Sequence, residues 1–224
     1  MTAGDTVTLE ALTAARTSVH GLAEHVLAVA ARAATRSIRL YVRDGALSTP
    51  DLPAADGGPE PTRLELRAGS VARRPGGPQV PFAGILGDLA RSLGVAFGLT
   101  DPPYRPASGC GPEHVVDVDD AAVEAVLDAW RVGDAALRRL APGETPVVWP
   151  EHLDVAIAWE AVNYGVSPGD GYEPWPYAYV GPHEPRAGDF WNAPFGAARR
   201  LSQLSGEAGV LAFFEAGRAE ATTA

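Results

Sequence analysis

The sequence predicts an α+β fold in which a mainly antiparallel sheet packs against helices. Three observations predict it: apolar residues at helical spacing near the N-terminus, period-two alternation after Trp149, and turn signals between the alternating runs. A chain of 224 residues can bury a core without disulfides or metal. We therefore predict a single compact domain over 1–224, with a helix-rich part and an early hairpin over 1–145. An aromatic-rich sheet with closing helices is expected over 146–224.

The first part of the chain predicts two helices and a hairpin. Apolar residues recur at intervals of three and four over 9–35, which is typical of a packing helix. The run that follows alternates apolar and polar residues up to Asp44-Gly45, a turn signal, so a hairpin is expected there. A second alternating run precedes a short helix over 84–97. The segment 98–114 holds too many prolines and glycines for regular structure and is predicted to be a surface loop.

The second part of the chain predicts a capped helix and an antiparallel meander. Asp117 or Asp119 can cap a helix that runs to about residue 140. From Trp149 a strand is expected, with Leu153, Val155, Ile157 and Trp159 on one face and Asp154, Ala156, Ala158 and Glu160 on the other. The runs VNYGVSPGD and WPYAYVGP are two further strand candidates, and a last helix is expected over about 208–219.

The composition excludes several classes of function. All 18 basic residues are arginine, so mechanisms that need a lysine are closed, such as Schiff-base aldolases, pyridoxal-phosphate enzymes and P-loop NTPases. A single cysteine, Cys110, excludes an internal disulfide and a four-cysteine metal site, and it fits a reducing compartment. The net charge of −10 disfavours nucleic acid as a partner. With no signal-peptide or membrane-span pattern, we expect a cytoplasmic protein without cofactor or membrane partner.

The segment Gly165-Val166-Ser167-Pro168-Gly169 matches the G-x-S-x-G pattern of a nucleophile elbow. An elbow needs a backbone N–H directly after the serine and a helix behind it, and Pro168 supplies neither. A turn between strands is therefore predicted, in which Asp170 accepts hydrogen bonds from nearby backbone N–H groups and Gly169 or Gly171 has positive φ.

The residues His20, Glu24 and His25 form an H-x-x-x-E-H pattern within the first predicted helix. On a regular helix His25 lies about 140° round from His20, so the three side chains cannot converge on one metal ion. Exposed or capping histidines are the favoured interpretation.

The cluster Glu151, His152 and Asp154 is the candidate catalytic group. At strand spacing His152 and Asp154 would project from one face, and a neighbouring loop could add His183, Glu184 or Asp170. Such a group would suit a mononuclear metal site or a His/carboxylate general base. A solvated outer face, or a polar network that fixes the strand ends, is the alternative interpretation.

Aromatic residues gather in the same segment, where 12 of 17 follow residue 148. They could line a cavity for a small molecule, or they could simply fill the core of a small sheet. The candidate ligand-binding residues are Asn163, Tyr164, Trp175, Tyr177, Tyr179, Trp191 and Asn192.

The strings WPEHLDVAIAW, VNYGVSPGD, PYAYVGP, DFWNAPFGA and VLAFFEAGR resemble a family of uncharacterised actinobacterial hypothetical proteins. The resemblance is specific in the last 80 or so residues. It implies a compact cytoplasmic domain in an actinobacterial setting and no particular reaction.

Two hypotheses of function follow from the sequence. The first is a small-molecule binding domain with an aromatic-lined cavity, which needs neither a metal nor turnover. The second is a metal-assisted or His/carboxylate acid–base enzyme that uses Glu151, His152, Asp154 and His183.

Overall fold

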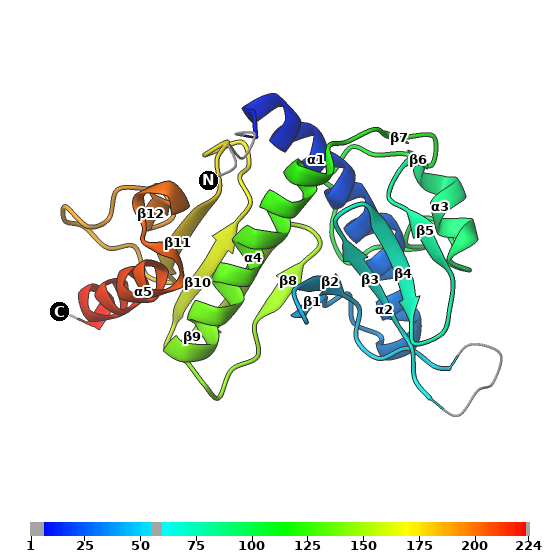
Figure 1. Cartoon of the computed structure of the whole chain (residues 1–224). Coiled ribbons are helices and arrows are strands. Elements are labelled where there is room, and N and C mark those ends of the chain that lie inside the picture. Colours follow the sequence, from blue (N-terminus) through cyan, green and yellow to red (C-terminus); the bar gives the residue numbers. More distant parts are fainter. Residues whose placement is uncertain (1–6, 55–59, 223–224) are drawn as a thin grey trace. The chain divides into compact units, whose positions relative to one another are not determined.

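The structure is a computed structural model that describes residues 7–54 and 60–222. The α+β class is confirmed, because helices accompany two antiparallel sheets of five strands each (Figure 1). The chain forms two compact units that meet between Leu127 and Asp128, and each unit contains one of these sheets. A single domain over 1–224 stays a prediction.

The first unit begins with the helical segment expected over 9–35. It consists of α1 (Leu9–Leu22), a π-helical turn (Ala23–Leu27) and α2 (Ala28–Thr35). The Thr8 hydroxyl caps α1 by accepting a hydrogen bond from the N–H of Ala11 at 3.1 Å. The helix ends where Arg36 adopts a left-handed conformation.

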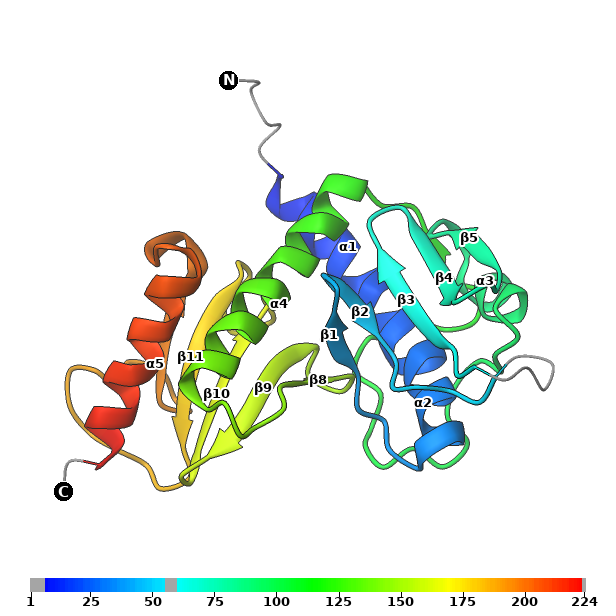
Figure 2. The same cartoon turned by 60° about the horizontal axis from the view of Figure 1, so that its bottom comes forward.

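The sheet of the first unit is a five-stranded meander that contains the predicted early hairpin. Its strands, in spatial and sequence order, are β1 (Tyr41–Arg43), β2 (Ala46–Ser48), β3 (Arg63–Arg67), β4 (Ser70–Arg74) and β5 (Gln79–Pro81). Both Asp44 and Gly45 have positive φ, as the tight turn between β1 and β2 requires. Alternation along β3 sends Leu64 and Leu66 into the core and Arg63, Glu65 and Arg67 to the other face. Figures 1 and 2 show α1 and α2 along one face of this sheet.

The rest of the first unit is mostly loop. A two-stranded ribbon pairs β6 (Gly84–Ile85) with β7 (Val115–Val116), and α3 (Leu86–Ser92) is shorter than the helix expected over 84–97. The segment 98–114 contains no helix or strand, as its prolines and glycines predict.

The second unit contains the predicted meander, and the predicted capped helix runs into this unit from the first. Asp119 accepts a hydrogen bond from the N–H of Ala121 at 2.8 Å, at the start of a helix that continues across the boundary between the units. The elements that follow each other along the chain are α4 (Asp120–Leu140), β8 (Val147–Trp149), β9 (Asp154–Trp159), β10 (Val162–Ser167), β11 (Tyr177–Pro182), β12 (Ala197–Arg200) and α5 (Gly206–Thr222). The sheet order β12-β11-β10-β9-β8 confirms an antiparallel meander.

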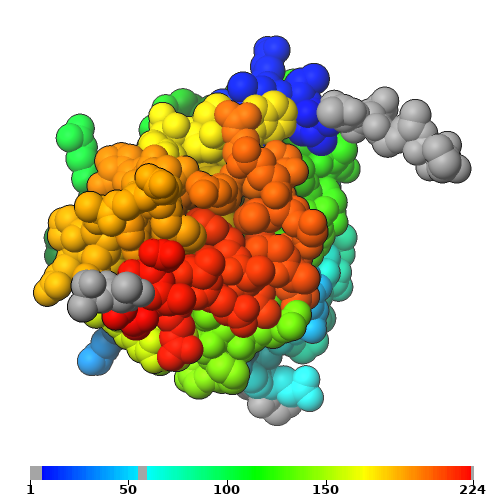
Figure 3. Space-filling model, turned by 90° about the vertical axis from the view of Figure 1, so that its left-hand side faces the viewer, coloured from blue at the N-terminus to red at the C-terminus, as the bar shows by residue number. Residues whose placement is uncertain are grey.

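Two glycines bring helices close to one face of this sheet. A Cβ on Gly133 of α4 would lie 2.7 Å from Val155, and one on Gly217 of α5 would lie 2.7 Å from Val180. Because each glycine lacks that Cβ, the helix backbone can approach the strands closely. Figure 3 shows α5, in red, at the surface of this unit beside the orange segment that leads into it.

None of the helices in the ranges 7–54 and 60–222 combines the length and the apolar character that spanning a membrane would require.

Candidate functional site

The strand predicted from Trp149 onward is wrong over residues 150–153, which form a turn between β8 and β9. The chain reverses between β8 and β9, where Leu153 has positive φ and its N–H donates to the Trp149 carbonyl at 2.7 Å. Glu151 and His152 lie in this tight turn, so the strand alternation that would align His152 with Asp154 is lost. Pro150 in this turn has no N–H to extend β8 pairing, and local turn hydrogen bonding replaces the extended chain.

Asp154, at the start of β9, is a buried carboxylic acid and the centre of the candidate site. Only 7% of the residue is exposed. Its Oδ2 accepts a hydrogen bond from the Tyr179 hydroxyl, whereas its Oδ1 is buried with no hydrogen-bond partner among the described residues. Burial raises the pKa of Asp154 above its ordinary value of 3.8, and the Tyr179 hydrogen bond and His152 work against that rise.

Glu151 adds a second carboxylate oxygen to this site. Its Oε2 is also buried without a hydrogen-bond partner in the part of the chain that is described. Its negative charge is close enough to Asp154 to favour the protonated form of that residue. The turn between β8 and β9 thus brings two acidic groups together although they do not share a strand.

Gly165 explains how Tyr179 reaches Asp154. The two residues belong to β11 and β9, which lie on either side of β10. Tyr179 pairs with Gly165, and a Cβ at that position would lie about 2.5 Å from the tyrosine hydroxyl. The missing side chain lets the ring cross β10. Burial, followed by the charge of Asp154, raises the pKa of Tyr179 well above 10.0.

Other aromatic rings contact Tyr179 on this face of the sheet. Phe195 packs edge-on against Tyr179 with 6.1 Å between ring centroids, and Tyr172 contacts Phe195 at 4.9 Å. Tyr172 and Phe195 are 47% and 38% exposed, so apolar ring surface is accessible to solvent close to a buried acid. We call Glu151, Asp154, Tyr172, Tyr179 and Phe195 the Asp154 site. Tyr172 and Phe195 are not among the residues predicted from the sequence, because ring contacts between loops carry no periodic signal.

Tyr177 joins this site to the turn after β10. Its hydroxyl donates to Asp170 at 2.7 Å, and its ring lies 6.3 Å from that of Tyr179. Asp170 also accepts from the N–H groups of Tyr172 at 2.8 Å and Glu173 at 3.1 Å. Gly169 has positive φ, so the predicted turn and the role of Asp170 in it are confirmed.

The predicted residues do not gather around one cavity. Tyr164 alternates with Gly165 along β10 and lies fully buried on the helix-covered face, 5.8 Å from the ring of Phe214. His183 contacts Asn163 at 3.4 Å, at the end of β10 and β11 away from Ser167 and Tyr177. His183 and Asp154 therefore lie at opposite ends of the strands, and His183 does not join His152 and Asp154.

The remaining predicted ligand-binding residues form hydrogen bonds or ring contacts within the second unit. Asn192 bonds the backbone of Ala198 through both of its amide atoms, at 2.9 and 3.2 Å. The ring of Trp191 packs edge-on against Phe190. The N–H of Trp175 donates to Glu173 at 3.1 Å. Of the predicted set, Tyr179 belongs to the Asp154 site and Tyr177 contacts it.

The motif His20, Glu24 and His25 departs from regular helix geometry. Both histidines lie within 4 Å of the Glu24 carboxylate, at 3.6 and 3.8 Å. The π-helical turn changes the angle between successive side chains, which regular helical spacing could not anticipate. The expected exposed histidines are instead largely covered, with 16% and 12% of their side chains accessible.

Glu24 attaches the 98–114 loop to the first helical segment. Its two carboxylate oxygens accept the N–H groups of Ala107 and Ser108, each at 2.9 Å, so it holds the 98–114 loop against the helix. Burial lowers the pKa of His25, whose ring stacks on Phe97.

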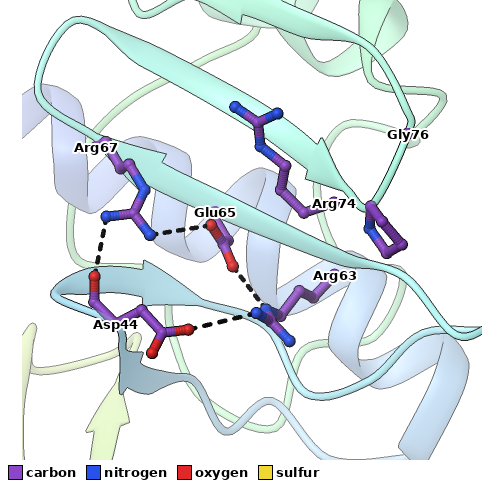
Figure 4. A pocket seen from close by; sticks show the side chains of 7 residues that line it. Asp44, Arg63, Glu65, Arg67, Arg74 and Gly76 are labelled. Atoms are coloured by element: carbon purple, nitrogen blue, oxygen red, sulfur yellow. Dashed lines mark hydrogen bonds and ion pairs between the residues drawn. The ribbon is translucent and has the colours of Figure 1, made fainter.

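A pocket also lies on the sheet of the first unit (Figure 4). It has a volume of about 530 Å³ and is lined by Asp44, Arg63, Glu65, Arg67, Arg74, Pro75 and Gly76. We call it the arginine pocket. The charged residues at alternate positions of β3 could have indicated this pocket from the sequence. Charges on the outer face of a sheet are common, however, and do not by themselves indicate a site.

No group of histidine, cysteine, aspartate and glutamate within the described ranges is arranged to hold a metal ion. Comparison of the chain with protein-family models, with curated proteins and with solved structures finds no match. The resemblance to actinobacterial hypothetical proteins stays a prediction.

Proposed function

We propose that this protein binds a small organic amine with an apolar body at the Asp154 site. The observation that carries the proposal is the buried Oδ1 of Asp154, which has no hydrogen-bond partner among the described residues. Tyr179, which donates to the other oxygen of Asp154, packs against the partly exposed ring of Phe195. Small-molecule binding with Tyr179 as a binding residue agrees with the first hypothesis drawn from the sequence. The Asp154 site differs from the aromatic cavity expected there, because Tyr179 is the one predicted ligand-binding residue that it contains.

The chemistry of the ligand follows from what the site lacks. A buried polar atom without a hydrogen-bond partner lowers the stability of the folded protein by about 1–3 kcal/mol. A ligand that donates a hydrogen bond to this atom would recover that free energy. The Oδ1 of Asp154 and the Oε2 of Glu151 are both such atoms, and both belong to acidic groups. A protonated amine offers N–H donors together with a positive charge, so it complements both oxygens.

The surrounding rings suit the rest of such a ligand. Tyr172 and Phe195 expose apolar surface, and a cation near a tyrosine ring is attracted by the ring's electron-rich face. The net charge of −10 also favours the approach of cations over anions. An amine attached to an aromatic or aliphatic body would use the unpaired acidic oxygens, the exposed rings and the negative net charge.

The test compares phenethylamine with 3-phenylpropionate by isothermal titration calorimetry. The two probes share a ring and a short linker and differ in the sign of their charge. We expect phenethylamine to bind and 3-phenylpropionate not to bind. Asp154→Asn should weaken phenethylamine binding by on the order of 10-fold or more, because a charge-assisted hydrogen bond is lost.

The matched control is Asp128→Asn. It removes the same charge from an exposed residue of α4 that pairs with Arg131, so binding should be unchanged. Equal loss in both variants would indicate general charge attraction and would contradict the proposal, as would unaltered binding in Asp154→Asn. Conversion of phenethylamine to a product by the wild type, abolished in Asp154→Asn, would instead favour the acid–base enzyme.

A further inference from the structure

The arginine pocket is separate from the Asp154 site and belongs to the first unit. Its lining residues come from the turn between β1 and β2, from β3, and from the end of β4 with the turn that follows. A volume of about 530 Å³ exceeds what a single inorganic ion fills and falls within the range of small-molecule sites.

Glu65 fixes the positions of two of the arginines. Its Oε1 lies 2.6 Å from the Nε of Arg63 and its Oε2 lies 3.3 Å from an Nη of Arg67. Only 4% of Glu65 is exposed, whereas the side chains of Arg63 and Arg67 are 33% and 45% exposed, so a buried carboxylate holds two guanidinium groups that solvent still reaches. Figure 4 shows Arg63 and Arg67 on either side of Glu65. Side chains held in this way lose little entropy when they bind a ligand.

Asp44 completes this arrangement from the neighbouring hairpin. Its carbonyl oxygen accepts a hydrogen bond from Arg67 at 2.9 Å, and its carboxylate lies 3.5 Å from Arg63. Each guanidinium has five N–H donors, and these contacts use only some of them. Donors therefore remain for a ligand in the pocket.

Arg74 carries the positive charge of the pocket that Asp44 and Glu65 do not balance. It donates to the neutral amide oxygen of Gln79 at 2.7 Å, and it forms no ion pair with an acidic residue in the described part of the chain. The lining contains three arginines and two acids, so its formal charge is +1 in a protein whose net charge is −10.

We propose that the arginine pocket binds a small organic molecule through a carboxylate group, with Arg74 as the main contact. A guanidinium matches the two oxygens of a carboxylate in a bidentate arrangement. A single negative charge balances the formal charge of +1 in the lining, whereas a phosphate dianion would leave an excess negative charge beside Glu65 and Asp44. A lining that combines arginines with acids also suits a ligand with both a carboxylate and a hydroxyl or amino donor.

The experiment titrates the full chain with lactate, acetate and inorganic phosphate at constant ionic strength, followed by NMR shifts of backbone amides. We expect lactate and acetate to shift the amides of 63–76 in a saturable way, with lactate binding more tightly. Arg74→Gln should weaken lactate binding by on the order of 10-fold or more, the loss expected for a charge-assisted contact.

The matched control is Arg91→Gln, which removes the same charge from an exposed arginine of α3 outside the pocket. Lactate binding should be unchanged in this variant. The proposal is overturned if the carboxylates cause no saturable shift, if the two variants weaken binding equally, or if phosphate binds more tightly than lactate. Arg74 is an arginine of the sheet surface, so folding of its variant is checked directly by the amide spectrum.

Discussion

At the scale of single residues, Asp154 is the group whose chemistry differs most from that of an ordinary surface carboxylate. Burial favours its protonated form and raises its pKa, while the Tyr179 hydroxyl donates a hydrogen bond to one oxygen. The other oxygen has no partner among the described residues. A residue retained only for stability would be expected to have both oxygens paired, so this position costs stability when it is ionised.

We expect Asp154→Asn to unfold at a higher temperature than the wild type above the folded-state pKa of Asp154. An aspartate whose pKa is raised on folding holds its proton more tightly in the native state, so native stability falls as pH rises from 3.8 through the folded-state pKa. The asparagine keeps a carbonyl that accepts from Tyr179 and carries no charge. The gain should be about 1 kcal/mol or more at neutral pH and should shrink on acidification.

Thermal melting of both proteins over a pH series checks this expectation. Asp128→Asn, which alters an exposed pair on α4, should show no such pH-dependent gain. A lower melting temperature for Asp154→Asn at neutral pH would mean that the charged carboxylate stabilises the fold.

At the scale of elements, the π-helical turn is the feature that links a helix to a long loop. It places Glu24 where both carboxylate oxygens meet backbone N–H groups of the 98–114 loop. A loop of this length without secondary structure gains little order from its own residues. We infer that Glu24 is the main polar anchor of the loop.

Glu24→Gln should loosen this loop without altering the sheet. The amide has one acceptor oxygen where the carboxylate has two, so one of the N–H groups of Ala107 and Ser108 loses its partner. We expect a loss of about 1–3 kcal/mol in unfolding free energy and faster hydrogen exchange at residues 107 and 108.

The control for this variant is Glu10→Gln, the same change in the exposed first turn of α1. Its exchange at the loop should match that of the wild type. Protection of residues 107 and 108 that survives in Glu24→Gln would show that other contacts hold the loop.

At the scale of the whole molecule, α4 is the element that belongs to both compact units. It runs without interruption from Asp120 to Leu140, and the boundary falls between Leu127 and Asp128. Buried apolar residues occur on both sides of that boundary, Val123 before it and Trp130 after it. Unfolding of either unit would therefore expose apolar surface on the same helix.

We expect the two units to unfold in one cooperative transition. All five tryptophans, Trp130, Trp149, Trp159, Trp175 and Trp191, lie in the second unit, so tryptophan fluorescence reports on that unit alone. Far-ultraviolet circular dichroism reports on both. The two signals should give the same urea midpoint, because a shared helix couples the units. Midpoints that differ beyond error would show that the units unfold independently.

The sequence by itself determined the local structure of this protein. Helical periodicity over 9–35, the Asp44-Gly45 turn and the meander from β9 to β11 all follow from residue spacing and turn chemistry, and each is confirmed. The sequence contains no lysine and one cysteine, and this composition excludes lysine-dependent mechanisms and internal disulfides whatever the fold. These properties depend on neighbours along the chain, which the sequence states directly.

Only the tertiary structure decided which polar groups meet. Tyr179 reaches Asp154 because Gly165 leaves space on the strand between them, and Glu24 meets a loop more than 80 residues away. A reversal of the chain removed His152 from the strand, and a π-helical turn rotated His25 toward Glu24. Such contacts depend on register and on small departures from regular geometry, neither of which periodicity encodes.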